Sequence, residues 1–229
     1  ELAELLRARL PSMQRVRFCS SGTEAVLNAL RAARAFTGRG HIAKFEGAYH
    51  GIDDPAMISY MPPVDASLGP ADRPHSVHSS AGLAPGTAES VVVLPLHDAD
   101  ACEAILRENA ADLAAVIIDP LSTATGLVLP QRAFLHRLRA VTRELGILLI
   151  FDEIVSFRLS IGGTQGAYEI DPDLTCLAKV IAGGTAGGAF GGTEDVMALY
   201  DPTGGPPAIA QSGTYNGNPI ATAAGLATL

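Results

Sequence analysis

Short apolar runs alternate with helix-like segments along most of this chain, and this alternation restricts its fold more than any other feature. The run Ala115–Asp119 is apolar up to its last residue, and the run Ile147–Phe151 is apolar throughout. Strands of this kind are typical of sheets that helices cover on both faces. Strands that alternate with helices favour an α/β domain with a mainly parallel sheet. Further strands are expected at 16–20, 41–45, 90–95 and 174–179, and helices at 24–36, 98–108 and 131–145.

Composition excludes several classes of protein. The chain has 229 residues, of which 48% are hydrophobic and 17% charged, enough to bury a substantial core. The formal net charge of −8 argues against nucleic acid or an anionic membrane surface as a partner. No run has the apolar length of a membrane span, and no signal peptide is visible. Three cysteines without CxxC spacing favour free thiols, so we expect a cytoplasmic protein.

Both ends of the chain lie within helical patterns, at 1–10 and 221–229, and neither end carries a stop signal. We therefore expect residues 1–229 to form one domain that is an internal piece of a longer protein.

Segment 61–89 shows no convincing period and is rich in Pro, Ser, Ala, Gly and His. A long irregular segment in a compact domain is usually a lid, a binding loop or a mobile loop. His75 and His78 lie in it without a third ligand nearby, so we expect no metal site.

Residues Ser20-Ser-Gly-Thr-Glu24 lie where a strand is followed by a helix. Gly22 lets backbone N–H groups approach an anion closely, and the hydroxyls of Ser21 and Thr23 add donors. A helix N-terminus also favours negative charge. The alternative is a plain N-cap, with Glu24 in the first helical turn.

Tyr49 lies between glycines just after the predicted strand at 41–45. Ligands in open α/β sheets bind at the carboxyl ends of strands, so this aromatic ring is a candidate for stacking on a planar ligand. The alternative is a core tyrosine beside a turn.

Asp152 and Glu153 follow the apolar run 147–151 directly. Burying an acidic pair there is costly unless something pairs with it, and the protonated nitrogen of a pyridine ring would be such a partner. A magnesium site is one alternative, although the chain has no GxxxxGK[ST] loop to accompany it. A surface pair at a strand end is another.

Lys179 is one of only two lysines in the chain and follows the apolar stretch 174–178. The alternative is a solvated surface charge, as most lysines are. A lysine amine can form a Schiff base with an aldehyde cofactor. Pyridoxal phosphate (PLP) requires such an amine, an acid for its ring nitrogen and an anion site for its phosphate. Lys179, Asp152 and Ser20–Thr23 supply these three parts. The glycine run at 183–192 gives no clear strand–GxGxxG–helix unit, so a dinucleotide site is not expected there.

Five motifs in this order resemble the class III (subgroup II) PLP-dependent aminotransferases, and the resemblance covers nearly the whole chain. The most similar members are the glutamate-1-semialdehyde aminomutases and the aminotransferases that act on β-amino acids. The motifs are Ser20-Ser-Gly-Thr-Glu-Ala25, Tyr49-His-Gly51, Leu149-Ile-Phe-Asp-Glu153, Pro172-Asp-Leu-Thr-Cys-Leu-Ala-Lys179 and Gly213-Thr-Tyr-Asn-Gly-Asn-Pro219.

The resemblance implies a PLP-dependent transferase of fold type I, of which this chain is the large domain. It also implies a homodimer with shared active sites. Lys179 would bind the cofactor covalently and shuttle a proton, and Asp152 would pair with the ring nitrogen. The other residues implied are Ile154 and Tyr49 on the two faces of the ring, Ser21, Gly22 and Thr23 at the phosphate, and Thr214 reaching the phosphate of the neighbouring subunit.

The chain departs from the family pattern mainly on the substrate side. Asp119-Pro-Leu replaces the usual Glu-Pro-Val, and Ala178 replaces the glycine that usually precedes the lysine. We predict transamination between a small-molecule amino donor and a carbonyl acceptor. The alternatives are glutamate-1-semialdehyde aminomutase activity and, from another class, a module that binds a phosphate ligand without covalent chemistry.

Overall fold

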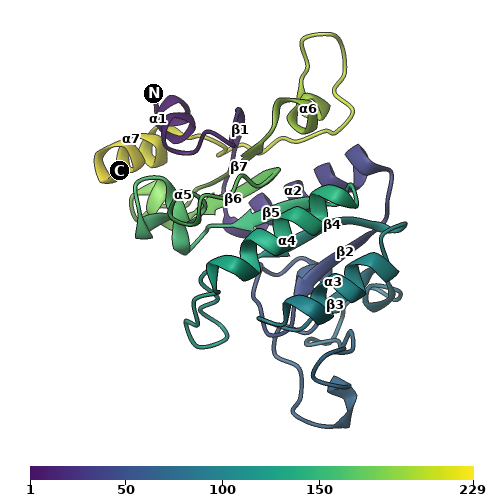
Figure 1. The fold of residues 1–229 in the computed structure, drawn as a ribbon. Helices are drawn as coiled ribbons and strands as arrows, with labels where there is room; N and C mark the ends of the chain where they lie inside the picture. The colour runs from purple at the N-terminus through teal and green to yellow at the C-terminus, as the bar shows by residue number, and fades with distance from the viewer.

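The computed structural model describes residues 1–229, apart from the side chain of Ala66, and is built on one mixed seven-stranded sheet (Figure 1). The strands are β1 (Arg15–Cys19), β2 (His41–Phe45), β3 (Val91–Leu94), β4 (Leu113–Ile118), β5 (Leu148–Asp152), β6 (Leu174–Ala178) and β7 (Gly188–Gly192). The helices are α1 (Leu2–Arg9), α2 (Gly22–Thr37), α3 (Ala99–Glu108), α4 (Arg132–Glu144), α5 (Gly163–Tyr168), α6 (Glu194–Met197) and α7 (Pro219–Thr228).

The strand order is β1-β7-β6-β5-β4-β2-β3. Strands β2 to β6 run parallel to one another, whereas β7 is antiparallel to both β6 and β1. Only β7 is therefore reversed, and the other six strands bring their carboxyl ends to one edge of the sheet. A crevice at that edge is where open α/β sheets bind ligands.

The sheet is covered on both faces, as the apolar strands predicted. Figure 1 shows α3 and α4 across the near face and α2 behind the sheet. One buried cluster lies under α2 and includes Ile42, Ile117 and Ile150, while a second lies under α3 and α4 and includes Ala43 and Phe151. Because side chains alternate along a strand, β2, β3, β4 and β5 each supply both clusters, whereas Leu177 of β6 and Ala189 of β7 pack in a third cluster with α1.

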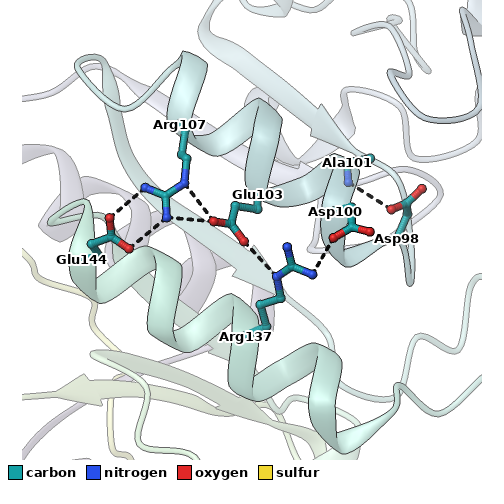
Figure 2. Close-up of polar contacts among 7 residues, drawn as sticks. All are labelled: Asp98, Asp100, Ala101, Glu103, Arg107, Arg137 and Glu144. Carbon is teal, nitrogen blue, oxygen red and sulfur yellow. Dashed lines mark hydrogen bonds and ion pairs between the residues drawn. The ribbon is translucent and has the colours of Figure 1, made fainter.

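Helices α3 and α4 are joined on their outer surface by exposed ion pairs (Figure 2). Arg107 of α3 contacts Glu144 of α4 at 2.8 Å, and Arg137 of α4 contacts Glu103 and Asp100 of α3 at 2.8 and 2.6 Å. Exposed pairs of this kind contribute little stability, typically about 0.2–1 kcal/mol each. The buried cluster beneath the two helices is therefore their main attachment to the sheet.

The predicted strands and helices are confirmed, with boundaries that differ by no more than two residues. Strand β7 was not predicted, because its residues were interpreted only as a glycine run. Segment 61–89 contains the short 3-10 helix Ala66–Leu68, and a second one, Ala88–Ser90, begins near its end. An isolated bridge pairs His78 of this segment with Ile58. Near the two ends, α1 packs on α7, and Arg9 donates a hydrogen bond to the Leu229 carbonyl.

Two kinds of feature are absent from the described residues. None of the helices has both the length and the apolar character needed to cross a membrane. No three His, Cys, Asp or Glu side chains gather closely enough to hold a metal ion.

Candidate active site

A cavity of about 300 Å³ opens at the edge where the six strands end. The segments that follow β1, β2, β4, β5 and β6 all reach it, and the residues that precede β7 close it because that strand runs in the opposite direction. The lining residues are Ser20, Ser21, Gly22, Thr23, Tyr49, Gly51, Asp119, Thr123, Asp152, Ile154, Val155, Ala178, Lys179, Thr185, Ala186 and Gly187.

Lys179 is the first residue after β6, and its side chain lines the cavity and is exposed. Its backbone has a φ of 51°, in the left-handed region that residues other than glycine rarely adopt. Such a conformation costs on the order of 1–3 kcal/mol and occurs most often at functional sites. Among the described residues no hydrogen bond or ion pair engages the Lys179 amine, so the amine is available to a ligand.

Asp152 is the last residue of β5 and is 4% exposed. Its Oδ2 lies 2.7 Å from Nδ1 of His50, and its Oδ1 accepts a hydrogen bond from the Ile154 N–H at 3.1 Å. Burial lowers the pKa of His50, although the hydrogen bond to Asp152 opposes that shift. We therefore assign His50 as a neutral imidazole that donates from Nδ1, which leaves Asp152 as the acceptor.

Glu153 points away from this pair. It is fully buried and accepts hydrogen bonds from the backbone N–H groups of Thr164 and Gln165, the latter at 3.0 Å. These N–H groups belong to the first turn of α5, so Glu153 caps that helix. The surface-pair interpretation of Asp152 and Glu153 is wrong, because both carboxylates are buried and paired.

Residues Ser20–Thr23 serve both as a cap and as part of the cavity wall. Ser21 Oγ accepts a hydrogen bond from the Glu24 N–H at 3.2 Å, which makes Ser21 the N-cap of α2. Gly22 and Thr23 occupy the first turn, where N–H groups have no partner within the helix. A Cβ on Gly22 would come within 2.6 Å of Ile154 Cδ1, so a larger residue here would require the Ile154 side chain to move.

Tyr49 lines the cavity and is 40% exposed, so the interpretation as a core tyrosine is wrong. Its ring packs on Tyr60 with centroids 4.8 Å apart. Ile154, the other residue proposed to contact a planar ring, lines the same cavity.

Thr214 lies outside the cavity of its own chain. It is exposed and begins the turn before α7. The nearby Asn216 side chain contacts Ser20 Oγ at 3.2 Å, which places this turn beside the phosphate-site candidate.

Sequence reasoning missed two acid–base groups of this site, His50 and Asp119. His50 was part of a motif but received no role, because its partner Asp152 lies 102 positions away in the sequence. Asp119 follows β4, which adjoins β5, and burial together with the charge of Asp152 raises the pKa of Asp119 to about 7. Its position after an apolar strand was the available signal.

The seven-stranded sheet and the cavity at its strand ends define the large domain of a fold type I transferase. The model of the family "Aminotransferase class-III" matches residues 1–229, and the chain belongs to that family.

Three relatives illustrate the range within the family. A glutamate-1-semialdehyde 2,1-aminomutase from Roseiflexus castenholzii is 47% identical over 100% of this chain and 50% of its own length. An omega-transaminase from Sphaerobacter thermophilus superposes with a TM-score of 0.95 at 47% identity, covering 99% of this chain and 51% of the other. A transaminase solved with PLP bound gives a TM-score of 0.90 at 38% identity, with coverages of 99% and 51%. The chain thus spans about half the length of these relatives.

Proposed function

We propose that this chain is the cofactor-binding part of a PLP-dependent aminotransferase, which transfers an amino group from an amino acid or amine to a carbonyl acceptor. The observation that carries the proposal is the meeting of Lys179, the His50–Asp152 pair and the first turn of α2 at one cavity. An amine, an acid held as an acceptor and unpaired N–H groups are the three parts that pyridoxal 5'-phosphate requires. The relative that was solved with PLP bound supports this choice of cofactor.

Each residue has a distinct role in this proposal. The N–H groups of Gly22 and Thr23, with the Ser21 and Thr23 hydroxyls, bind the phosphate at the N-terminus of α2. Asp152, oriented by His50, holds a proton on the ring nitrogen, and the protonated ring supplies an electron sink for the carbon that carries the amino group. Tyr49 and Ile154 orient the ring. Lys179 Nζ would hold the cofactor covalently, and its amine would move a proton at the substrate carbon.

Intramolecular amino transfer is the second candidate function. The relative from Roseiflexus castenholzii bears the aminomutase name and matches this chain at 47% identity, the same value as the omega-transaminase. The residues above would serve both reactions, because both require a base to move a proton at the substrate carbon, and Lys179 would be that base. Incubation with glutamate-1-semialdehyde alone distinguishes them, since only an aminomutase forms 5-aminolevulinate without a second substrate.

We also propose a homodimer in which Thr214 reaches the phosphate of the neighbouring subunit. The exposure of Thr214, and its position outside the cavity of its own chain, support this arrangement. We propose the cytoplasm as its location, which the three free, buried cysteines support.

Borohydride reduction after addition of PLP to the full-length protein tests the proposal, with peptide mapping of the product. Residues 1–229 contain two lysines, and Lys44 is fully buried, so within these residues a pyridoxyl group is expected on Lys179 alone. Lys179→Ala should abolish both the adduct and the visible absorption band. Binding of PLP without any adduct would instead favour the non-covalent phosphate-ligand module, and an adduct on Lys44 would contradict the assignment.

A further inference from the structure

Lys44 is a fully buried lysine to which the proposed reaction assigns no role. It lies on β2, where its cross-strand neighbours are Val93 and Ile117. Both neighbours belong to the cluster under α2, so Lys44 faces that side of the sheet. Ile117 of β4 pairs in register with Ile150 of β5. Asp119 lies two residues after Ile117, and Asp152 lies two residues after Ile150; both acids line the cavity. Lys44 therefore lies one row of side chains below those acids, beneath the cavity.

The environment of Lys44 gives its ammonium little compensation for burial. Among the described residues no carboxylate lies within ion-pair distance of Lys44 Nζ. The amine donates a hydrogen bond to the Ile58 carbonyl at 2.5 Å. Burial lowers the pKa of Lys44 to about 7, and the charge of Glu46 only partly opposes that shift. A methionine would fill the same space without this cost, which indicates that the amine has a purpose other than packing.

The hydrogen bond of Lys44 holds the base of the loop that carries the site. This loop, residues 46–59, leaves the carboxyl end of β2, presents Tyr49 and His50, and returns so that the Gly47 N–H donates to the Ser59 carbonyl at 2.8 Å. Ser59 is fully buried with a φ of 49°, a left-handed conformation that surrounding contacts must maintain. Ile58 adjoins Ser59, so the Lys44 bond fixes the loop at its strained return.

The charge of Lys44 also acts on His50. His50 is 1% exposed, and its Nε2 has no hydrogen-bond partner among the described residues. Burial is the main cause that lowers the pKa of His50, Asp152 raises it, and the Lys44 ammonium lowers it further. A second proton on the imidazole is disfavoured by both burial and Lys44, so the single proton stays on Nδ1, where it is shared with Asp152.

We propose that Lys44 is a positioning residue of the active site, which ties loop 46–59 to β2 through the Ile58 carbonyl and keeps His50 a neutral Nδ1–H donor to Asp152. Only the role of Asp152 at the cofactor depends on the proposed function. The contact of Lys44 with the loop and its effect on His50 do not. Tyr49 and His50 lie on the loop whose return at Ile58 is held by the Lys44 amine, so one buried charge acts on both the stacking ring and the acid pair.

The test compares Lys44→Met, which removes the charge and the donor, with Lys44→Arg, which keeps both. Ile42→Val is the matched control, because Ile42 lies on the same face of β2 and is fully buried. Nitrogen NMR of the cofactor-free, full-length protein reports the tautomer and pKa of His50, whose signal is identified by its loss in His50→Gln. Hydrogen exchange at the Gly47 and Ser59 amides reports the loop.

Lys44→Met is expected to raise the pKa of His50, because it removes a positive charge that lowers that pKa. It should also speed exchange at the two amides by about tenfold. Lys44→Arg should preserve the His50 pKa, and Ile42→Val should change neither quantity. Unchanged His50 titration in Lys44→Met would overturn the proposal, as would an equal shift in Ile42→Val. Neither measurement needs PLP, so a protein that fails to bind PLP would refute the proposed function without deciding the role of Lys44.

Discussion

Asp152 and Glu153 are adjacent acids of equal charge, and both are buried, yet the structure uses them for different purposes. Asp152 ends its strand on the α2 side, where it contacts His50 and the cavity. Glu153 is directed to the first turn of α5, whose N–H groups it satisfies. A sequence shows only that the pair follows an apolar strand. Which acid meets a ligand depends on the alternation of side chains at the strand end and on a helix that begins ten residues later.

Asp119 provides a prediction about pH at the residue scale. Its pKa is raised from the ordinary 3.8 to about 7, mainly by burial and then by the charge of Asp152. Between those values the folded protein keeps a proton that the unfolded chain releases, so the folded state binds more protons. The contribution of Asp119 to stability is therefore largest below pH 4 and is lost as pH rises toward 7.

In the cofactor-free protein, Asp119→Asn should remove the decrease in the free energy of unfolding that Asp119 causes as pH rises. Denaturant unfolding at several pH values between 4 and 8 measures this slope. The pKa of His50 is lowered and gives a slope of opposite sign, but His50 is present in both proteins, so their difference isolates Asp119. Asp171→Asn, at an exposed position, is the control and should leave the slope unchanged. A wild-type slope that persists in Asp119→Asn would show that Asp119 titrates normally.

The site could be predicted in part from single residues. Lys179, Asp152, Tyr49 and Ser21–Thr23 follow strands, and the cavity brings all of them together. His50 and Asp119 were missed because their roles come from neighbours across the sheet. Nothing in the sequence around position 50 reveals an orienting carboxylate on another strand. The left-handed backbone of Lys179 was equally invisible, since no glycine marks it.

At the scale of elements, β7 shows why local sequence misses some strands. Gly188, Gly191 and Gly192 form most of it, and glycine is depleted in strands because it lacks a side chain to pack. The structure requires glycine there for space. A Cβ on Gly192 would lie 2.1 Å from the Asp173 carbonyl, and one on Gly191 would lie 2.3 Å from the Arg15 carbonyl. The strand exists because two neighbouring strands hold it, not because its residues favour it.

Gly192→Ala should therefore destabilise the protein, because backbone rather than a flexible side chain blocks the added methyl group. We expect a loss of at least about 1–3 kcal/mol in the free energy of unfolding, the usual cost of overpacking a core. Gly166→Ala is the control, since its Cβ would meet no atom within 4 Å in helix α5. Denaturant unfolding of both variants checks the comparison. Equal stability of Gly192→Ala and wild type would mean that β7 can move away from Asp173 at little cost.

At the scale of the whole molecule, the direction of the strands explains why residues far apart in the sequence meet at the cavity. The cavity combines residues 20–23 after β1 with residues 185–187 before β7, and the two strands are antiparallel neighbours. The alternation of strands and helices predicted a mainly parallel sheet. It did not predict that β7 would lie between β1 and β6 and close the cavity, since the order of strands depends on long-range pairing. The exposed turn at 214–217 lies at the same end of the sheet, beside Ser20.

The proposed sharing of sites can be tested by mixing two inactive variants. Lys179→Ala removes the amine, and Thr214→Asp places a negative charge where a phosphate is proposed to bind. If Thr214 serves the neighbouring subunit, a mixed dimer holds one site with both changes and one site with neither. Mixing the unfolded variants and refolding them together should then restore up to about a quarter of wild-type activity, because half of the dimers are mixed and each has one intact site. If Thr214 serves its own subunit, every site carries one change and no activity returns. Each variant refolded alone is the control, and it must stay inactive for the recovery to be interpreted.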